Sequence, residues 1–136
     1  MSRSYWGIIG YGVNLDDVPN LNSEKVNRLV RKINPLEKFE GDVLEDDTFC
    51  GGRYNSLAEF VCELDTTNSL TWDDGGDCGG QYVLYAPKYP WQVKDNDPRS
   101  IVDVEARLLT VLQKIYDVPI NELKEKIGYI SDYGCG

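Results

Sequence analysis

Histidine is absent from this 136-residue chain, and its absence removes much of the usual chemistry of a small enzyme. Without imidazole there is no Ser-His or Cys-His pair and no histidine base that works near neutral pH. No other nucleophile motif takes its place. We therefore expect a binding protein rather than an enzyme, and we predict no cofactor.

Long apolar runs are also lacking. The longest, residues 5–13, has about half the length of a membrane-spanning helix. The same region makes a poor signal peptide, because it offers one basic residue, three glycines and no clean cleavage site. These features predict a cytoplasmic protein with no membrane contact.

Cysteines are few and scattered. Cys50, Cys62, Cys78 and Cys135 form no C-x-x-C pair, so the spacing rules for a zinc site are not met. The compartment argument predicts four free thiols in a reducing cytosol. The alternative is one disulfide between distant cysteines.

Acidic residues, by contrast, are abundant and unevenly placed. Eleven acidic residues and one basic residue lie between Glu40 and Asp77, a net charge of −10 in a chain whose total is −9. A field this concentrated steers cationic partners or mimics an anionic polymer. It argues against direct binding of nucleic acid, whose phosphates need cations.

The hydrophobic pattern predicts one domain, residues 1–136, of the α+β class. Apolar residues recur at helical spacing in 22–34, in 56–64, in a long segment opened by Asp97-Pro98, and in 121–127, which we expect to end at Gly128. Strands are predicted for 5–13, 70–72 and 81–86, and the tail 129–136 forms a last strand or stays unfixed. This order indicates a small, mainly antiparallel sheet with about four helices packed on one face.

The segment between the strands 70–72 and 81–86 is rich in aspartate and glycine. Asp73, Asp74 and Asp77 would lie on a long, mobile connection between the two strands. Carboxylates on a flexible glycine loop are typical of hard-cation sites. The register of an EF-hand is not met, because Gly75 stands at a ligand position and no glutamate closes the loop.

Two groups of residues are the candidate partner-binding site. The acidic group comprises Glu45, Asp46, Asp47, Asp73, Asp74 and Asp77, and we expect its two segments to converge into one patch. The aromatic group is Tyr89 and Trp91, which follow the predicted hairpin and would anchor the same partner. Charge would then set the association rate and the buried aromatics the residence time.

Residues 72–80, 82–91 and 128–136 together resemble short acidic accessory proteins encoded by phages and prophages of Gram-positive bacteria. Some of those proteins are anti-defence proteins, including anti-CRISPR inhibitors that offer carboxylates where DNA phosphates would bind. The resemblance implies a protein of the bacterial host cytoplasm that inhibits a basic, nucleic-acid-handling host protein, for example a CRISPR effector. It implies no site residues.

Two alternatives stay open. The loop 73–80 could form a module that binds a small molecule or a calcium-type metal, or the chain could be a structural or assembly protein of a virion. The sequence leaves the oligomeric state open.

Overall fold

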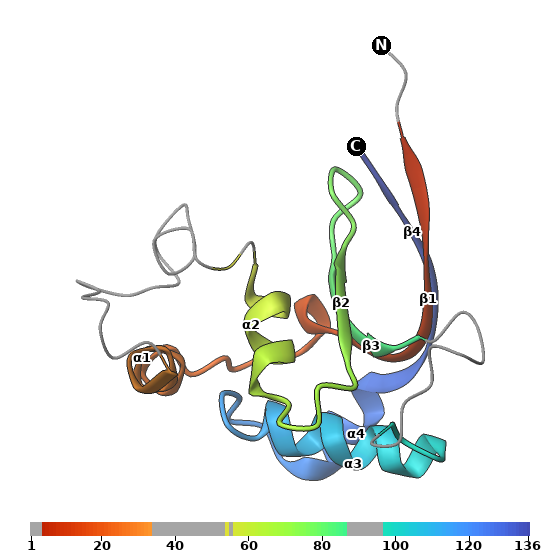
Figure 1. The fold of residues 1–136 in the computed structure, drawn as a ribbon. Coiled ribbons are helices and arrows are strands. Elements are labelled where there is room, and N and C mark those ends of the chain that lie inside the picture. Colours follow the sequence, from red (N-terminus) through yellow and green to blue (C-terminus); the bar gives the residue numbers. More distant parts are fainter. Residues whose placement is uncertain (1–3, 34–53, 55, 87–96) are drawn as a thin grey trace.

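The computed structural model describes residues 4–33, 54, 56–86 and 97–136. A four-stranded antiparallel sheet has the order β2-β3-β1-β4. The strands are β1 (Tyr5–Asn14), β2 (Thr71–Asp74), β3 (Gln81–Tyr85) and β4 (Ile127–Cys135). The helices are α1 (Ser23–Ile33), α2 (Leu57–Leu64), α3 (Ile101–Leu112) and α4 (Ile120–Lys126), and the 3-10 turn η1 (Leu15–Asp17) follows β1. The predicted α+β class is confirmed (Figure 1).

Local capping explains where α2 and α3 begin. Ser56 accepts a hydrogen bond from the backbone N–H of Glu59 and starts α2, at the beginning of the helical segment predicted for 56–64. The side chain of Gln81 on β3 accepts a second bond, from Ala58 N–H, and so joins this helix to the sheet. The cap of α3 is Ser100, which lies beyond the expected Asp97-Pro98 start.

The helices all pack on one face of the sheet. Residues of α1, α2, α3 and α4 share one core with Val13, Val83 and Ile127 of the sheet. Alternation along the strands directs these three side chains to the helical side. Their burial against four helices is the main apolar contact of the fold.

On the other face of the sheet, the described residues that pack together belong to the strands or, for Ala86, directly follow β3. Ile8, Tyr82 and Leu84 form a second, smaller core with the partly buried Trp6 and Ile130, and none of these residues belongs to a helix. This is possible because the sheet curls until its outer strands meet at a bridge between Gly76, just after β2, and Cys135 of β4. In Figure 1 the β1–β4 ribbon and the β2–β3 hairpin accordingly rise side by side above α3 and α4.

Glycines in β1 permit this curvature. A Cβ atom added at Gly10 would lie 2.6 Å from a methyl carbon of Leu84, and one at Gly12 would overlap the backbone of β3. Only hydrogen fits where the two strands approach so closely. The glycines of β1 thus mark where its backbone lies closest to β3.

The predicted short helix and the last strand are both present, but the strand begins earlier than expected. α4 ends at Lys126, one residue before the predicted end, and Gly128 already belongs to the strand. Ile127 already has extended backbone angles, and Gly128 pairs with Gly12 in the sheet. The tail therefore forms a nine-residue strand that pairs along β1, from Ile127 opposite Val13 to Cys135 opposite Tyr5.

The prediction of four free thiols is wrong. Cys78 and Cys135 form a disulfide across 57 residues of sequence, whereas Cys62 is a free thiol and Cys50 lies outside the described residues. The two cysteines meet because the hairpin and the end of β4 converge, which spacing alone does not reveal. Because the cysteines are not all free, they no longer support the prediction of a reducing cytosol.

Within the described part of the chain, no helix has both the length and the apolar character that a membrane span requires.

Reduction should destabilise the protein. A bond that closes a loop of 57 residues restrains the unfolded chain, and its loss should lower the free energy of unfolding by roughly 2–4 kcal/mol. Urea unfolding with and without a thiol reductant measures the difference. A Cys78→Ser/Cys135→Ser variant is the control, because its stability should equal that of the reduced protein and ignore the reductant. Equal stability of the oxidised and reduced wild-type chains would contradict the prediction.

Candidate partner-binding site

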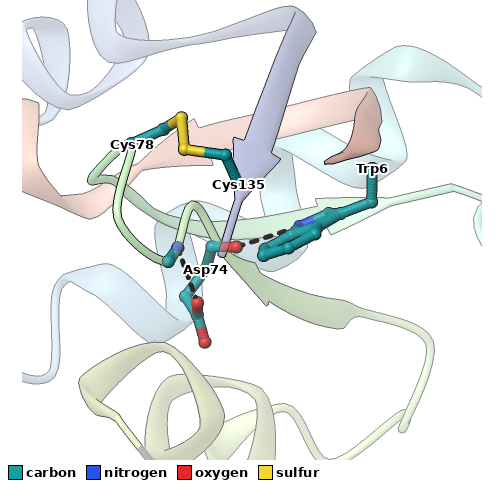
Figure 2. Close-up of a disulfide and its surroundings, with 5 residues drawn as sticks. Trp6, Asp74, Cys78 and Cys135 are labelled. Atoms are coloured by element: carbon teal, nitrogen blue, oxygen red, sulfur yellow. Dashed lines mark hydrogen bonds between the residues drawn. A yellow bond between two sulfur atoms is a disulfide. The ribbon is translucent and has the colours of Figure 1, made fainter. Parts of the chain in front are cut away.

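The turn of the β2–β3 hairpin carries the three predicted aspartates. Asp73 and Asp74 are the last residues of β2, opposite Tyr82 and Gln81, and Asp77 lies in the turn. Asp74 Oδ1 accepts a hydrogen bond of 2.9 Å from Gly76 N–H, and its backbone carbonyl accepts one of 3.2 Å from Trp6 Nε1. Figure 2 shows the Asp74 carboxylate pointing away from the disulfide.

This turn is short and firmly held, unlike the long, mobile connection that the sequence predicts. Asp77 N–H donates to the carbonyl of Cys135 at 2.7 Å, and Cys135 N–H donates to the carbonyl of Gly75 at 3.0 Å. The Cys78–Cys135 disulfide closes the same contact (Figure 2). Gly76, with a φ of 57°, has the left-handed backbone that such a tight turn needs. The aspartates are therefore presented on a fixed scaffold.

The calcium alternative finds little support in this geometry. Asp74 uses one carboxylate oxygen inside the turn. Among the residues that the structure describes, no group of three carboxylate or thiol side chains is placed to hold a metal ion. Hard cations need several converging oxygens.

A groove lies beside the hairpin, between α2 and β2. Its volume is about 680 Å³. Its walls combine two glutamates with aromatic and small polar side chains. The lining residues are Tyr54, Glu59, Cys62, Glu63, Asn68, Leu70, Thr71 and Trp72.

The Cys62 thiol that lines the groove is not activated as a nucleophile. Burial, assisted by the nearby charges of Asp65 and Glu59, raises the pKa of the Cys62 thiol to about 12. The thiol is therefore protonated at neutral pH and a poor nucleophile. The groove also contains two glutamates and the half-buried indole of Trp72. Carboxylates beside an aromatic ring are suited to binding a cationic side chain.

The neighbouring Asp65 stabilises the loop that follows α2. Its buried carboxylate accepts hydrogen bonds from the backbone and hydroxyl groups of Thr67 and Ser69. Burial works to raise the pKa of Asp65, but these hydrogen bonds outweigh it and hold the pKa below its usual value. Arg107 Nη1 donates to both hydroxyls and so ties the network to α3.

A second acidic cluster was missed by sequence reasoning. Tyr82 donates its hydroxyl to Asp132 Oδ2 at 2.8 Å across the concave face of the sheet. Burial, the hydrogen bond to Asp132, and the charges of Asp132, Asp17 and Asp16 raise the pKa of Tyr82 to about 12. These aspartates come from η1 and β4, so only the folded chain brings them together.

Asn14 positions η1 against the hairpin. Its side-chain oxygen accepts hydrogen bonds from Asp16 N–H at 3.1 Å and from Gln81 N–H at 3.2 Å. The segment after β1 is rich in turn-forming residues, among them Asp16, Asp17 and Pro19, but the sequence does not show where this segment packs.

Five of the eight predicted site residues lie outside the described residues. These residues are Glu45, Asp46, Asp47, Tyr89 and Trp91. Their convergence with Asp73, Asp74 and Asp77 stays a prediction.

Comparison with protein-family models, with curated proteins and with solved structures found no match to this chain.

The buried tyrosines should make the protein alkali-sensitive. Tyr82 keeps its proton in the native state up to a pKa of about 12, whereas the unfolded chain releases it near the ordinary value of 10.0. Burial, with a contribution from Asp16, also raises the pKa of Tyr116. Between pH 10 and 12 the unfolded state binds fewer protons, so the free energy of unfolding should fall as pH rises.

Urea unfolding at several alkaline pH values measures this slope. Tyr82→Phe should reduce it by about 1.4 kcal/mol per pH unit, the equivalent of one proton. An unchanged slope in that variant would show that Tyr82 titrates normally in the folded protein.

Proposed function

We propose that this chain is a phage-type, non-catalytic inhibitor that binds a basic, nucleic-acid-handling protein of a bacterial host, for example a CRISPR effector, through its acidic surface. The observation that carries the proposal is the placement of carboxylates on and beside the β2–β3 hairpin. Asp73, Asp74 and Asp77 lie on its end, and Glu63 lines the adjoining groove. A protein surface that binds nucleic-acid phosphates is lined with lysine and arginine. The carboxylates of this chain could bind that surface in place of the phosphates.

The groove supplies a means of recognition beyond charge. An arginine or lysine side chain entering it would meet the Trp72 ring and the carboxylate of Glu63. Cation–π contact contributes about 0.5–2 kcal/mol, depending on how far the cation is desolvated. The pairing of an aromatic ring with carboxylates therefore favours a basic protein over a simple counterion.

Rigidity of the hairpin end supports the same function. The disulfide and the backbone bonds to Cys135 hold the aspartates in place before any partner arrives. A preordered surface loses less conformational entropy on binding. The same carboxylates should therefore bind a partner more tightly on this ordered turn than they would on a flexible loop.

The basic residues Lys25, Arg28 and Lys32 lie on α1, and Lys25 is paired with a carboxylate. Lys25 Nζ lies 2.7 Å from Asp117 Oδ1, and Asn22 donates to the other oxygen of the same carboxylate. An exposed pair of this kind adds little stability. It does reduce the positive charge that would otherwise oppose approach to a cationic partner.

Binding of target DNA by a purified effector–guide RNA complex, in the presence of increasing amounts of this protein, tests the proposal. The wild-type chain should displace the DNA, and its inhibition should weaken as salt rises. An Asp73→Asn/Asp74→Asn/Asp77→Asn variant should inhibit at least about tenfold less well, because charge complementarity is lost. The asparagine at position 74 can still accept the bond from Gly76.

A matched control removes three carboxylates elsewhere. Glu24 on α1 and Glu122 and Glu125 on α4 are exposed, so Glu24→Gln/Glu122→Gln/Glu125→Gln changes the net charge equally. The control should inhibit like the wild type. Equal loss in both variants would reduce the effect to net charge, and failure of the wild type to displace DNA from a panel of effectors would reject the proposal.

A further inference from the structure

The outer side of β4 is one edge of the sheet. The hydrogen-bonding pattern with β1 determines which of its N–H and C=O groups point toward β1 and which point away. Ser4 and Gly136 exchange two hydrogen bonds, N–H to O, of 2.7 and 3.0 Å. In an antiparallel pair such doubly bonded positions alternate with positions whose groups point outward. The register with β1 therefore turns the N–H and C=O groups of Tyr129, Ser131 and Tyr133 away from β1, toward the free edge.

Both ends of this edge are already occupied. At the end of β4, Cys135 N–H donates to Gly75 and its carbonyl accepts from Asp77. At the beginning, Ile127 N–H donates to the carbonyl of Lys124 in α4. Within the part of the chain that the structure describes, the outward groups between these positions have no hydrogen-bond partner. The open edge thus runs from residue 129 to residue 133.

The open edge is symmetric in sequence about Ser131. Tyr129 and Tyr133 flank it at equal distance, and Gly128 and Gly134 follow on either side. We propose that the partner of this edge is a second copy of the chain, paired antiparallel about Ser131 in a two-fold symmetric dimer. This proposal is independent of the inhibitory function.

The symmetric register uses every open group. Ser131 would face Ser131 of the other copy, and each Tyr129 would face a Tyr133, giving six N–H···O bonds across the dimer axis. A shift of the register by two residues places Tyr133 opposite Ile127, or Tyr129 opposite Cys135. The outward N–H groups of Ile127 and Cys135 are already bonded, so the shifted registers form fewer hydrogen bonds between the two copies.

Exposed aromatic side chains favour the same pairing. Tyr5, Tyr129 and Tyr133 are 66%, 78% and 63% exposed on the outer face of the β1–β4 ribbon. The Tyr5 and Tyr133 ring centroids lie 6.4 Å apart, and those of Tyr11 and Tyr129 lie 5.0 Å apart. Pairing about Ser131 would place Tyr133 beside Tyr129 of the other copy, so each row would contain four rings. Cross-strand aromatic pairs contribute about 0.2–1 kcal/mol each.

The edge also lacks the usual protection against pairing. Natural edge strands are commonly interrupted by proline or lined with charge. β4 contains no proline, and its one charged residue, Asp132, accepts the hydroxyl of Tyr82 on the concave face. The outer face of the strand is therefore uncharged at the positions that would meet a second copy.

Sedimentation equilibrium of the full oxidised chain, over roughly a hundredfold range of concentration, tests the proposal. The wild type should form a dimer that strengthens slightly with salt, because two copies of charge −9 repel one another. This salt dependence is opposite to that expected for the binding of a basic partner, so the two proposals fail independently. A wild type that stays monomeric throughout would overturn the dimer.

Ser131 offers a matched set of variants, since its outward groups serve no bond within the described chain. Ser131→Lys would place like charges opposite each other, and Ser131→Pro would remove the central N–H; each should weaken the dimer at least about tenfold. Ser131→Thr keeps both the N–H and the strand preference and should dimerise like the wild type. Circular dichroism checks that each variant folds, and Ser131→Lys serves if the proline variant does not.

Hydrogen exchange locates the contact. The amides of Tyr129, Ser131 and Tyr133 should exchange more slowly at high protein concentration in the wild type and rapidly at every concentration in Ser131→Lys. A dimer that survives Ser131→Lys, or that leaves these three amides unprotected, would assign the interface to another surface and overturn the proposal.

Discussion

The return of β4 to the β2–β3 turn is the contact on which the remaining structure depends. One residue, Cys135, makes three links to this turn, through its sulfur, its N–H and its carbonyl. These links join the two outer strands of a sheet that would otherwise lie open. With the ends joined, the sheet must curl, and one of its faces becomes an interior.

The curl divides the apolar residues into two cores with different partners. The larger core lies between the sheet and four helices, as in most α+β folds. Among the described residues, the smaller one, around Ile8 and Leu84, is made by the strands and by Ala86, which directly follows β3. A Cβ on Gly134 would overlap the Trp6 ring that helps to close this interior. The same closure fixes the aspartates of the turn and brings Asp132 to Tyr82.

Local signals in the sequence predicted most of the elements. The strand at 5–13, the helix at 56–64 and the hairpin could be predicted because periodicity and turn residues act over a few positions. Gly128 follows α4 closely, as a glycine at a helix C-terminus often does, but it has no capping conformation and continues into a strand paired with β1. Tertiary pairing overrode the local preference.

The long-range features could not be read in this way. The Cys78–Cys135 bond spans 57 residues, and the Tyr82–Asp132 bond joins residues 50 apart. Neither spacing carries a signal, because both contacts follow from the curl of the sheet. The charge pattern of the sequence identified the hairpin aspartates, but it did not reveal the groove beside α2. The groove depends on how Gln81 docks the helix on the sheet.

The disulfide also has a mechanical consequence. Ser4 and Gly136 lie side by side, so tension applied to this pair would separate the ends of β1 and β4 one hydrogen bond at a time. After Cys135, however, the load would pass through the sulfur–sulfur bond to Cys78 and along the chain toward β1. The segment between the two cysteines, with β3, α3, α4 and nearly all of β4, would bear no force. The covalent ring thus acts as a load bypass, and extension of that half of the molecule requires chemical reduction as well as force.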